Sequence, residues 1–380
     1  MRNMRELILS MGIGIMILGS CNQSQETLTL SGLDPKNFIS EVNGKQTGLY
    51  ILKNKSGMEV CLTNFGGRIV SVMVPDKTGK MQDVVLGFDN IKDYQTIPSD
   101  FGATIGRYAN RINKGKIVID GDTIQLPTNN FGHTLHGGPN GWQYKIFDAN
   151  QIDGTTLEMT LNSPDGDENF PGNMTAKVTF KLTEDNAIDI KYSATTDKKT
   201  VVNMTNHSYF NLAGDASKPI TDHILYVNSD DYTPVDETFM TTGEILPVKG
   251  TPMDFTTPKP VGQEIDNFEF AQLKNGNGYD HNWVLSTAGN INEVAARLTS
   301  PQTGIVMELY TNEPGVQVYT GNFLDGTVTG KNNIVYKQRT AICLETQHYP
   351  DSPNKADWPS VLLEPGQTYR SQCIYKFSVQ

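Results

Sequence analysis

The chain has 380 residues, a formal net charge of −11 at pH 7 and 37% hydrophobic residues. This acidic balance argues against nucleic acid as a partner, because phosphates are bound by clustered basic side chains, and it disfavours an anionic membrane surface. A neutral small molecule is compatible with this composition.

The first twenty residues have the features of an export signal. Two arginines precede an apolar run over residues 7–18, which is too short to span a bilayer as a mature helix. The run ends in Leu-Gly-Ser-Cys at residues 18–21, which resembles the bacterial lipobox, whose cysteine becomes lipidated. We therefore predict a lipoprotein signal peptide at residues 1–20, lipidation of Cys21 and a tether at residues 21–34. An ordinary signal peptide with an incidental cysteine is the alternative. The lipobox interpretation implies an exported bacterial lipoprotein that is membrane-anchored and either periplasmic or on the cell surface.

The hydrophobic pattern of the remaining chain has a period of two. Apolar and polar residues alternate at 177–182 and again at 188–193, as expected for half-buried antiparallel strands. Turns rich in Gly, Asp or Asn are expected at residues 76–79, 120–121, 165–166 and 275–278. Because no long stretch after the signal has helical periodicity, the sequence predicts an all-β sandwich or barrel.

The segment 35–380 is longer than one ordinary sandwich requires. No low-complexity linker divides it, and no internal repeat is visible. We expect a single large domain of stacked, extended antiparallel sheets, with two sandwich domains joined without a visible linker as the alternative.

Several polar residues interrupt the strand pattern in unusual contexts. Glu345 lies among apolar strand residues, so its carboxylate must be desolvated or paired and its pKa should shift. A buried, salt-bridged glutamate is the alternative interpretation. Gln317 alternates with two valines and therefore faces solvent or a cavity. His, Asp, Asn, Gln, Arg and aromatic residues on Gly- and Asn-rich loops suit a sugar, whose hydroxyl groups need hydrogen-bonding partners and whose ring needs an apolar face.

Six segments resemble, in order, the signatures of the aldose 1-epimerases, also called galactose mutarotases. They are residues 101–112 (FGATIGRYANRI), 135–138 (LHGG), 205–212 (TNHSYFNL), 278–281 (GYDH), 314–323 (PGVQVYTGNF) and 344–347 (LETQ). The resemblance extends from about residue 47 to residue 380. It implies a large β-supersandwich and an isomerase that interconverts the α and β anomers of free aldohexoses such as galactose and glucose, in hexose metabolism.

The resemblance also implies residue roles. Glu345 would be the general base that removes the proton of the anomeric hydroxyl, and His207 the general acid that protonates the ring oxygen. Glu345 would then have to be ionised and His207 protonated, which requires the lower pKa on Glu345. The residues expected to hold or surround the sugar are Asn110, Arg111, His136, Ser208, Tyr209, Asp280 and Gln317. No cofactor is required by this chemistry, and we expect a monomer whose partners are small aldoses.

Other functions remain open. A glycoside hydrolase could use Glu345 and Asp280 as its carboxylate pair. A lipid-anchored carbohydrate-binding protein would need the hydroxyl-binding residues but no matched acid and base. A hexose 6-phosphate epimerase would need a basic cluster at the cleft, whereas the motifs bring only Arg107 and Arg111.

One segment bears on metal binding. Residues 165–169 (DGDEN) superficially resemble a calcium loop but lack the twelve-residue EF-hand pattern. No cysteine pair has the spacing of metal ligands. We therefore expect a loop near the cleft and no metal site, with bound calcium as the lesser alternative.

Overall fold

The computed structural model describes residues 28–42 and 44–380. The predicted signal peptide and Cys21 lie outside these residues. No helix within the described ranges is long and apolar enough to cross a membrane. The predicted tether does overlap them, and there it differs from the expectation: Thr29 and Leu33 are buried, and the Leu33 N–H donates to Thr29 Oγ1 at 2.9 Å. Because Leu33 packs in a core cluster with Phe38, the end of that range belongs to the folded domain.

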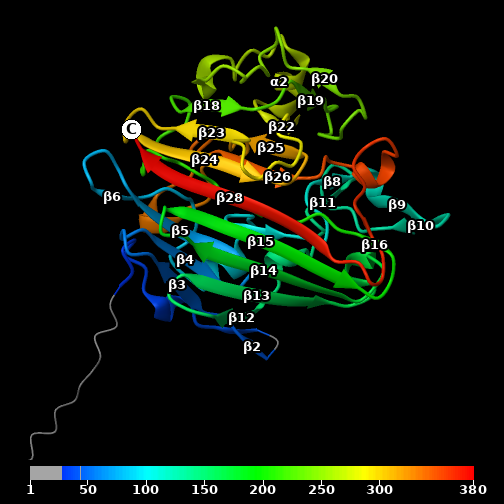
Figure 1. Cartoon of the computed structure of the whole chain (residues 1–380), viewed down its shortest axis with the longest axis horizontal. Helices are drawn as coiled ribbons and strands as arrows, with labels where there is room; N and C mark the ends of the chain where they lie inside the picture. Colours follow the sequence, from blue (N-terminus) through cyan, green and yellow to red (C-terminus); the bar gives the residue numbers. More distant parts are fainter. Residues whose placement is uncertain (1–27, 43) are drawn as a thin grey trace, which may run out of the picture.

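The largest sheet has nine antiparallel strands and crosses the whole molecule (Figure 1). In spatial order these are β12 (Asp148–Gln151), β13 (Thr156–Ser163), β14 (Met174–Leu182), β15 (Ala187–Thr196), β28 (Tyr369–Val379), β24 (Ile305–Thr311), β23 (Ala296–Thr299), β18 (Ile224–Val227) and β21 (Lys259–Pro260). The two alternating segments of the sequence lie within β14 and β15, where buried residues alternate with more exposed ones. The predicted all-β class is confirmed.

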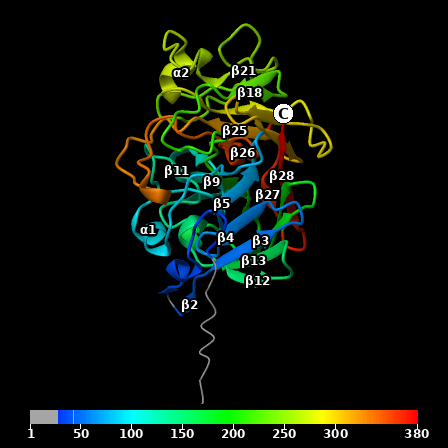
Figure 2. The ribbon, with the colours of Figure 1, turned by 90° about the vertical axis from the view of Figure 1, so that its left-hand side faces the viewer.

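Two smaller antiparallel sheets pack with the large one. The five-stranded sheet has the order β20 (Leu246–Pro247), β19 (Asp231–Thr233), β22 (Asp280–Val284), β25 (Gly315–Tyr319) and β26 (Cys343–Gln347), and the four-stranded sheet has β3 (Leu49–Lys53), β4 (Glu59–Thr63), β5 (Arg68–Pro75) and β6 (Met81–Asp83). Figure 2 shows β3, β4 and β5 in the half of the molecule that holds β12 and β13, with β25 and β26 in the other half. Every residue of β4, β25 and β26 is buried, so both faces of these strands are covered.

Within the described residues, short strand pairs and two α-helices of six residues each connect the sheets. The pairs are β1 (Glu41–Val42) with β2 (Lys45–Gln46), β7 (Ala103–Ile105) with β17 (Thr205–His207), β8 (Arg111–Ile112) with β11 (Thr134–Leu135), β9 (Lys116–Ile119) with β10 (Asp122–Gln125), and β16 (Thr200–Val201) with β27 (Leu362–Leu363). The helices are α1 (Ile91–Thr96) and α2 (Ala271–Gly276). The turn expected at 275–278 instead begins inside α2, which Asn277 ends with a left-handed φ of 52°.

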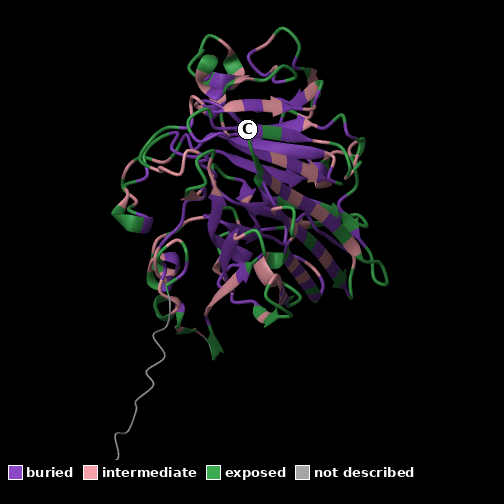
Figure 3. Cartoon of the chain, turned by 60° about the vertical axis from the view of Figure 1, so that its left-hand side comes forward, coloured by how far each residue is buried: buried purple, intermediate pink, exposed green. Residues whose placement is uncertain are grey.

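One hydrophobic core joins the three large sheets. Leu62 of β4, Val178 of β14 and Leu344 of β26 belong to the same cluster of buried side chains, which extends along the chain from Leu52 to Phe377. Figure 3 shows buried residues through the middle of the molecule and exposed ones on the peripheral loops. The polar residues of the site are therefore held against a rigid, apolar scaffold.

Candidate active site

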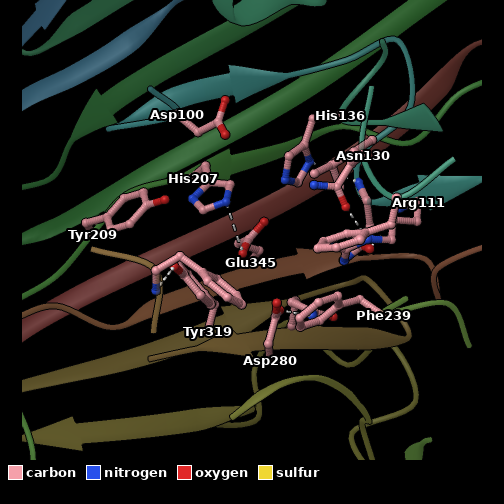
Figure 4. A pocket seen from close by; sticks show the side chains of 15 residues that line it. Asp100, Arg111, Asn130, His136, His207, Tyr209, Phe239, Asp280, Tyr319 and Glu345 are labelled. Atoms are coloured by element: carbon pink, nitrogen blue, oxygen red, sulfur yellow. Dashed lines mark hydrogen bonds and ion pairs between the residues drawn. The ribbon is translucent and has the colours of Figure 1, made fainter. Parts of the chain in front are cut away.

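A pocket of about 290 Å³ lies where the five-stranded sheet meets the β7–β17 and β8–β11 pairs (Figure 4). It is lined by Asp100, Asn110, Arg111, Asn130, Phe131, Leu135, His136, His207, Tyr209, Phe239, Asp280, Gln317, Tyr319, Phe323 and Glu345. Of the nine residues proposed from the sequence as catalytic or sugar-binding, eight line this pocket, and Ser208 is the exception. Only two of the six histidines of the chain, His136 and His207, are among them.

The floor of the pocket is one face of the five-stranded sheet. Strand register places Gln317 directly opposite Glu345, and Asp280 opposite Tyr319. Directly paired residues of antiparallel strands share a face, so these four side chains project to the same side. The amide of Gln317 donates from Nε2 to Asp280 Oδ1 at 2.7 Å, and this hydrogen bond links the two cross-strand pairs.

The opposite wall carries His207, the last residue of β17. Its strand pairs with β7, with His207 opposite Ala103. The ring stacks on Tyr209 with centroids 5.0 Å apart and an interplanar angle of 17°. Because neighbouring residues of an extended chain point to opposite sides, Ser208 between them faces away from the pocket. Its backbone N–H donates to Asn206 Oδ1 at 3.1 Å, and the expectation that Ser208 contacts the sugar is not supported by this geometry.

Glu345 and His207 face each other inside the pocket. Glu345 Oε1 lies 3.5 Å from His207 Nε2, and their side chains are 2% and 6% exposed. The second oxygen, Glu345 Oε2, is buried and has no hydrogen-bond partner among the described residues. A buried carboxylate oxygen is normally satisfied, so this one is available to a ligand in the pocket.

Burial acts on both members of this pair. It raises the pKa of Glu345 well above its usual value, helped by the nearby carboxylates Asp280 and Asp100 and opposed by Arg111. Burial also lowers the pKa of His207, while Asp100 opposes the shift. The two pKa values therefore move toward each other, whereas the sequence argument required Glu345 to remain clearly the stronger acid. Desolvation of both charged forms is the physical reason for the difference.

Arg111 forms the far end of the pocket. Its Nε donates to Asn130 Oδ1 at 3.1 Å, and its guanidinium lies 4.9 Å from the centroid of the Phe239 ring. This buried cation lowers the pKa of Asp280, which burial alone raises. Arg111 thus keeps its remaining N–H donors for a ligand while it offsets negative charge.

A hydrogen bond to the His136 ring determines which of its nitrogens carries the proton. The backbone N–H of Asn110 donates to His136 Nδ1 at 3.2 Å, which leaves the proton of the neutral ring on Nε2. Burial, His207 and Arg111 hold the pKa of His136 well below its usual value. Both residues have left-handed backbones, with φ of 66° at Asn110 and 52° at His136. The following Gly137 has φ of 81°, and a Cβ there would lie 2.1 Å from the carbonyl oxygen of Gly106.

Comparisons with known proteins agree with this site. The family model of aldose 1-epimerases matches residues 48–376. The chain belongs to the aldose 1-epimerase family. It is 42% identical to the galactose mutarotase of Homo sapiens over 85% of this chain and 92% of the relative, and 38% identical to the aldose 1-epimerase of Escherichia coli (strain K12) over 88% and 96%. The crystal structure of galactose 1-epimerase from Lactobacillus acidophilus NCFM has a TM-score of 0.79 at 29% identity and covers 90% of this chain and 97% of its own.

The pocket of this epimerase also contains residues that the sequence did not single out. Leu135, Tyr319 and Phe323 belong to the recognised segments, so those segments could have suggested them. Asp100 directly precedes the first segment. Asn130, Phe131 and Phe239 have no sequence signal, because they reach the pocket only through long-range packing: Phe239, for example, lies against Phe131 with ring centroids 5.5 Å apart.

In this epimerase, two aspartates of the loop that superficially resembles a calcium site form ion pairs with lysines. Asp165 Oδ2 pairs with Lys198 Nζ at 2.5 Å, and Asp167 pairs with Lys145. Neither aspartate lines the pocket. Among the described residues, the side-chain groups with the spacing of metal ligands are instead Asp100, His136 and His207, and His207, Cys343 and Glu345.

Proposed function

We propose that this epimerase interconverts the α and β anomers of free aldohexoses, galactose and glucose among them, by acid–base opening and closing of the ring. The observation that carries the proposal is the buried pair of Glu345 and His207, 3.5 Å apart, in a pocket lined with hydroxyl-binding side chains. The relatives named galactose mutarotase and aldose 1-epimerase support it.

Ring opening needs two proton transfers on different oxygens. Glu345 accepts the proton of the anomeric hydroxyl, and His207 delivers a proton to the ring oxygen. The bond between C1 and the ring oxygen then breaks and leaves an open-chain aldehyde. After rotation about C1–C2, His207 takes its proton back from the chain hydroxyl and Glu345 returns its own to the aldehyde oxygen as the ring closes.

The protonation states of Glu345 and His207 explain how their burial helps the reaction. The closed sugar is bound by ionised Glu345 and protonated His207, and the open-chain sugar by protonated Glu345 and neutral His207. Burial favours the second state over the first, because it penalises both charged forms. Two states of similar free energy allow the proton to move in either direction, as an isomerase that runs both ways requires.

The remaining polar residues would hold the sugar. Arg111 and the Nε2–H of His136 donate hydrogen bonds, and Asp280 accepts them. Asn110 and Gln317 offer both kinds of partner. Tyr209 and Tyr319 provide aromatic surface, which suits the apolar face of a sugar ring. Fixing the sugar in this way places its reacting oxygens at the acid and the base.

Polarimetry tests the function directly. Purified protein should accelerate the rotation change of freshly dissolved α-D-galactose and α-D-glucose, and the ratio of the two rates gives the preference. A glycoside hydrolase would instead release nitrophenol from a nitrophenyl glycoside. A binding protein would bind the sugar without accelerating its mutarotation. Absence of acceleration with a folded protein would refute the proposal.

We also propose that the reaction requires no cofactor or metal. Both chemical steps are proton transfers between the sugar and side chains of the pocket. Activity should therefore be unchanged after dialysis against EDTA. Loss of activity that added calcium restores would contradict this proposal.

For the N-terminus, we propose a lipid anchor at Cys21. Support for the anchor comes from the sequence at residues 1–21, where an apolar run precedes Leu-Gly-Ser-Cys. Separately, we propose that the folded domain is a monomer. Cys21→Ser should move the protein from the membrane to the soluble fraction. Retention of this variant in the membrane would refute the anchor, and a dimeric mass by light scattering would refute the monomer.

A further inference from the structure

Asp100 is the one pocket residue whose charge faces the acid and which the mechanism above does not use. One of its carboxylate oxygens and one ring nitrogen each of His136 and His207 lie within 4.8 Å of one another. In Figure 4 the His207 ring lies between Asp100 on one side and Glu345 on the other. His207 is thus placed between two carboxylates that come from different parts of the fold.

The loop that carries Asp100 is fixed by a buried arginine. Arg68, on β5, donates from Nη1 to the carbonyl oxygen of Phe101 at 2.9 Å and from Nη2 to that of Ser99 at 3.0 Å. The two carbonyl groups flank Asp100 on either side. The main chain on both sides of Asp100 is therefore tied to β5, which places the residue beside His207 as part of the scaffold.

The Asp100 carboxylate is itself incompletely satisfied. Its Oδ1 is buried and has no hydrogen-bond partner in the part of the chain that the structure describes. Asp100 also lines a second cavity of about 280 Å³, which shares Tyr209, Tyr319 and Phe323 with the first. Asp100 as a whole is part-buried, and a carboxylate that makes no structural hydrogen bond through its buried oxygen acts on its surroundings mainly through its charge.

The other groups around His207 do not supply this charge. Burial raises the pKa values of Tyr209, Tyr319 and Cys343 well above their usual range, so these groups stay neutral. His136 stays neutral because its pKa is held low. Arg68 is a cation and opposes protonation of His207. Glu345 is the partner in proton exchange, which leaves Asp100 as the fixed anion beside the ring.

We propose that Asp100 is a positioning residue that holds the shared proton of the acid–base pair on His207 rather than on Glu345. The inference rests on the proposed function of that pair. An anion stabilises a proton more strongly on the nearer group. Asp100 forms a close cluster with His136 and His207, and Glu345 is not a member of that cluster, although it forms a second one with His207 and Cys343. Its charge thereby offsets the burial that favours the neutral pair and raises the fraction of enzyme ready to open a ring.

Asp100→Asn tests the inference, because asparagine keeps the shape and removes the charge. We expect kcat/KM for galactose to fall about tenfold, and both limbs of its pH profile to move to lower pH by about one unit, the usual effect of a charge at this distance. Nitrogen NMR of labelled histidine should show a smaller imidazolium fraction at His207, assigned by comparison with His207→Asn. All measurements are made in EDTA, so that no metal occupies the Asp100–His136–His207 cluster.

Two variants control for other effects. Asp325→Asn removes an exposed carboxylate from the second cavity and should leave the pH profile unchanged. Asp100→Glu retains the charge and should restore both limbs more fully than Asp100→Asn. If folded Asp100→Asn instead raises KM with unmoved limbs and an unchanged His207 spectrum, Asp100 is a sugar contact and the inference is wrong. A parent protein without mutarotase activity would refute the proposed function itself. Failure of the Asp100 inference alone would leave the parent protein active.

Discussion

The pocket has two halves that are built by different means. The sheet half consists of Asp280, Gln317 and Glu345 on β22, β25 and β26, where strand register alone places the side chains on one face. The loop half includes Asn110 and His136, whose positions depend on left-handed backbone conformations and on hydrogen bonds such as the one between them. The proposed base therefore comes from regular structure, and much of the proposed sugar-binding surface from irregular structure.

This difference shows how rigidity is divided across the site. In the sheet half, a side chain moves only if the strands move, and every residue of β25 and β26 is buried in the scaffold. In the loop half, each side chain is held by a few specific contacts, so one substitution can misplace it. Substitutions in the sheet half should mainly remove chemistry, whereas those in the loop half should mainly remove positioning.

The largest effect is expected at the acid–base pair. Glu345→Gln keeps the shape of the side chain but cannot accept the proton, and we expect kcat to fall by about a hundredfold to ten-thousandfold. His207→Asn should lose a similar amount. Because both groups serve one proton-transfer cycle, the double variant should be little worse than the poorer single one. Polarimetry gives the rates.

Circular dichroism provides the control for this double-mutant comparison, since each variant must have the parental spectrum. Additive losses in the double variant would show that the two groups act in separate steps. Near-parental mutarotation by folded Glu345→Gln would exclude Glu345 as the base.

The pH dependence sharpens the role of this pair. The working form carries one proton shared by Glu345 and His207, so kcat/KM should be bell-shaped, with limbs that belong to the pair. Activity is lost at low pH when a second proton arrives, and at high pH when the single proton leaves. In Glu345→Gln only His207 remains to titrate, and burial lowers its pKa. Residual activity should then fall as pH rises through a value below 6.5, and a bell that persists in this variant would contradict the assignment.

The two halves also differed in what the sequence could predict. Period-two alternation placed Gln317 on the face opposite its valine neighbours, and the buried context of Glu345 predicted the shifted pKa, because strand geometry is local. The loop residues Asn110 and His136 were identified only through the resemblance to a family. Asp100 and Phe239 were missed because their approach to the pocket depends on contacts such as those of Arg68 with the 99–101 loop, which join distant parts of the chain.

A smaller loss is expected at Arg111, which lies on β8 next to the loop residue Asn110. Arg111→Ala removes a buried cation that contacts Asn130 and Phe239, and we expect kcat/KM to fall about tenfold to a hundredfold, as for a lost hydrogen bond to a charged group. Without the guanidinium, the pKa of Asp280 should rise further, because Arg111 now lowers it. Arg111→Lys is the control: it keeps the charge without the planar fork. Unchanged kinetics in both variants would remove Arg111 from the sugar site.

The smallest effect is expected at Ser208, between two residues that line the pocket. His207 and Tyr209 face the cavity, so the alternation of the chain points the Ser208 hydroxyl away from it. This hydroxyl is buried, and within the described residues its Oγ has no hydrogen-bond partner. Removing an unsatisfied buried hydroxyl is close to neutral for stability, because no bond is lost and no partner is left unpaired.

Ser208→Ala should therefore keep kcat/KM within about twofold of the parent and leave the free energy of unfolding within about 1 kcal/mol. Polarimetry and urea unfolding measure the two quantities. A tenfold rise in KM would show that the serine contacts the sugar after all, and that the chain rotates around His207 when the substrate binds.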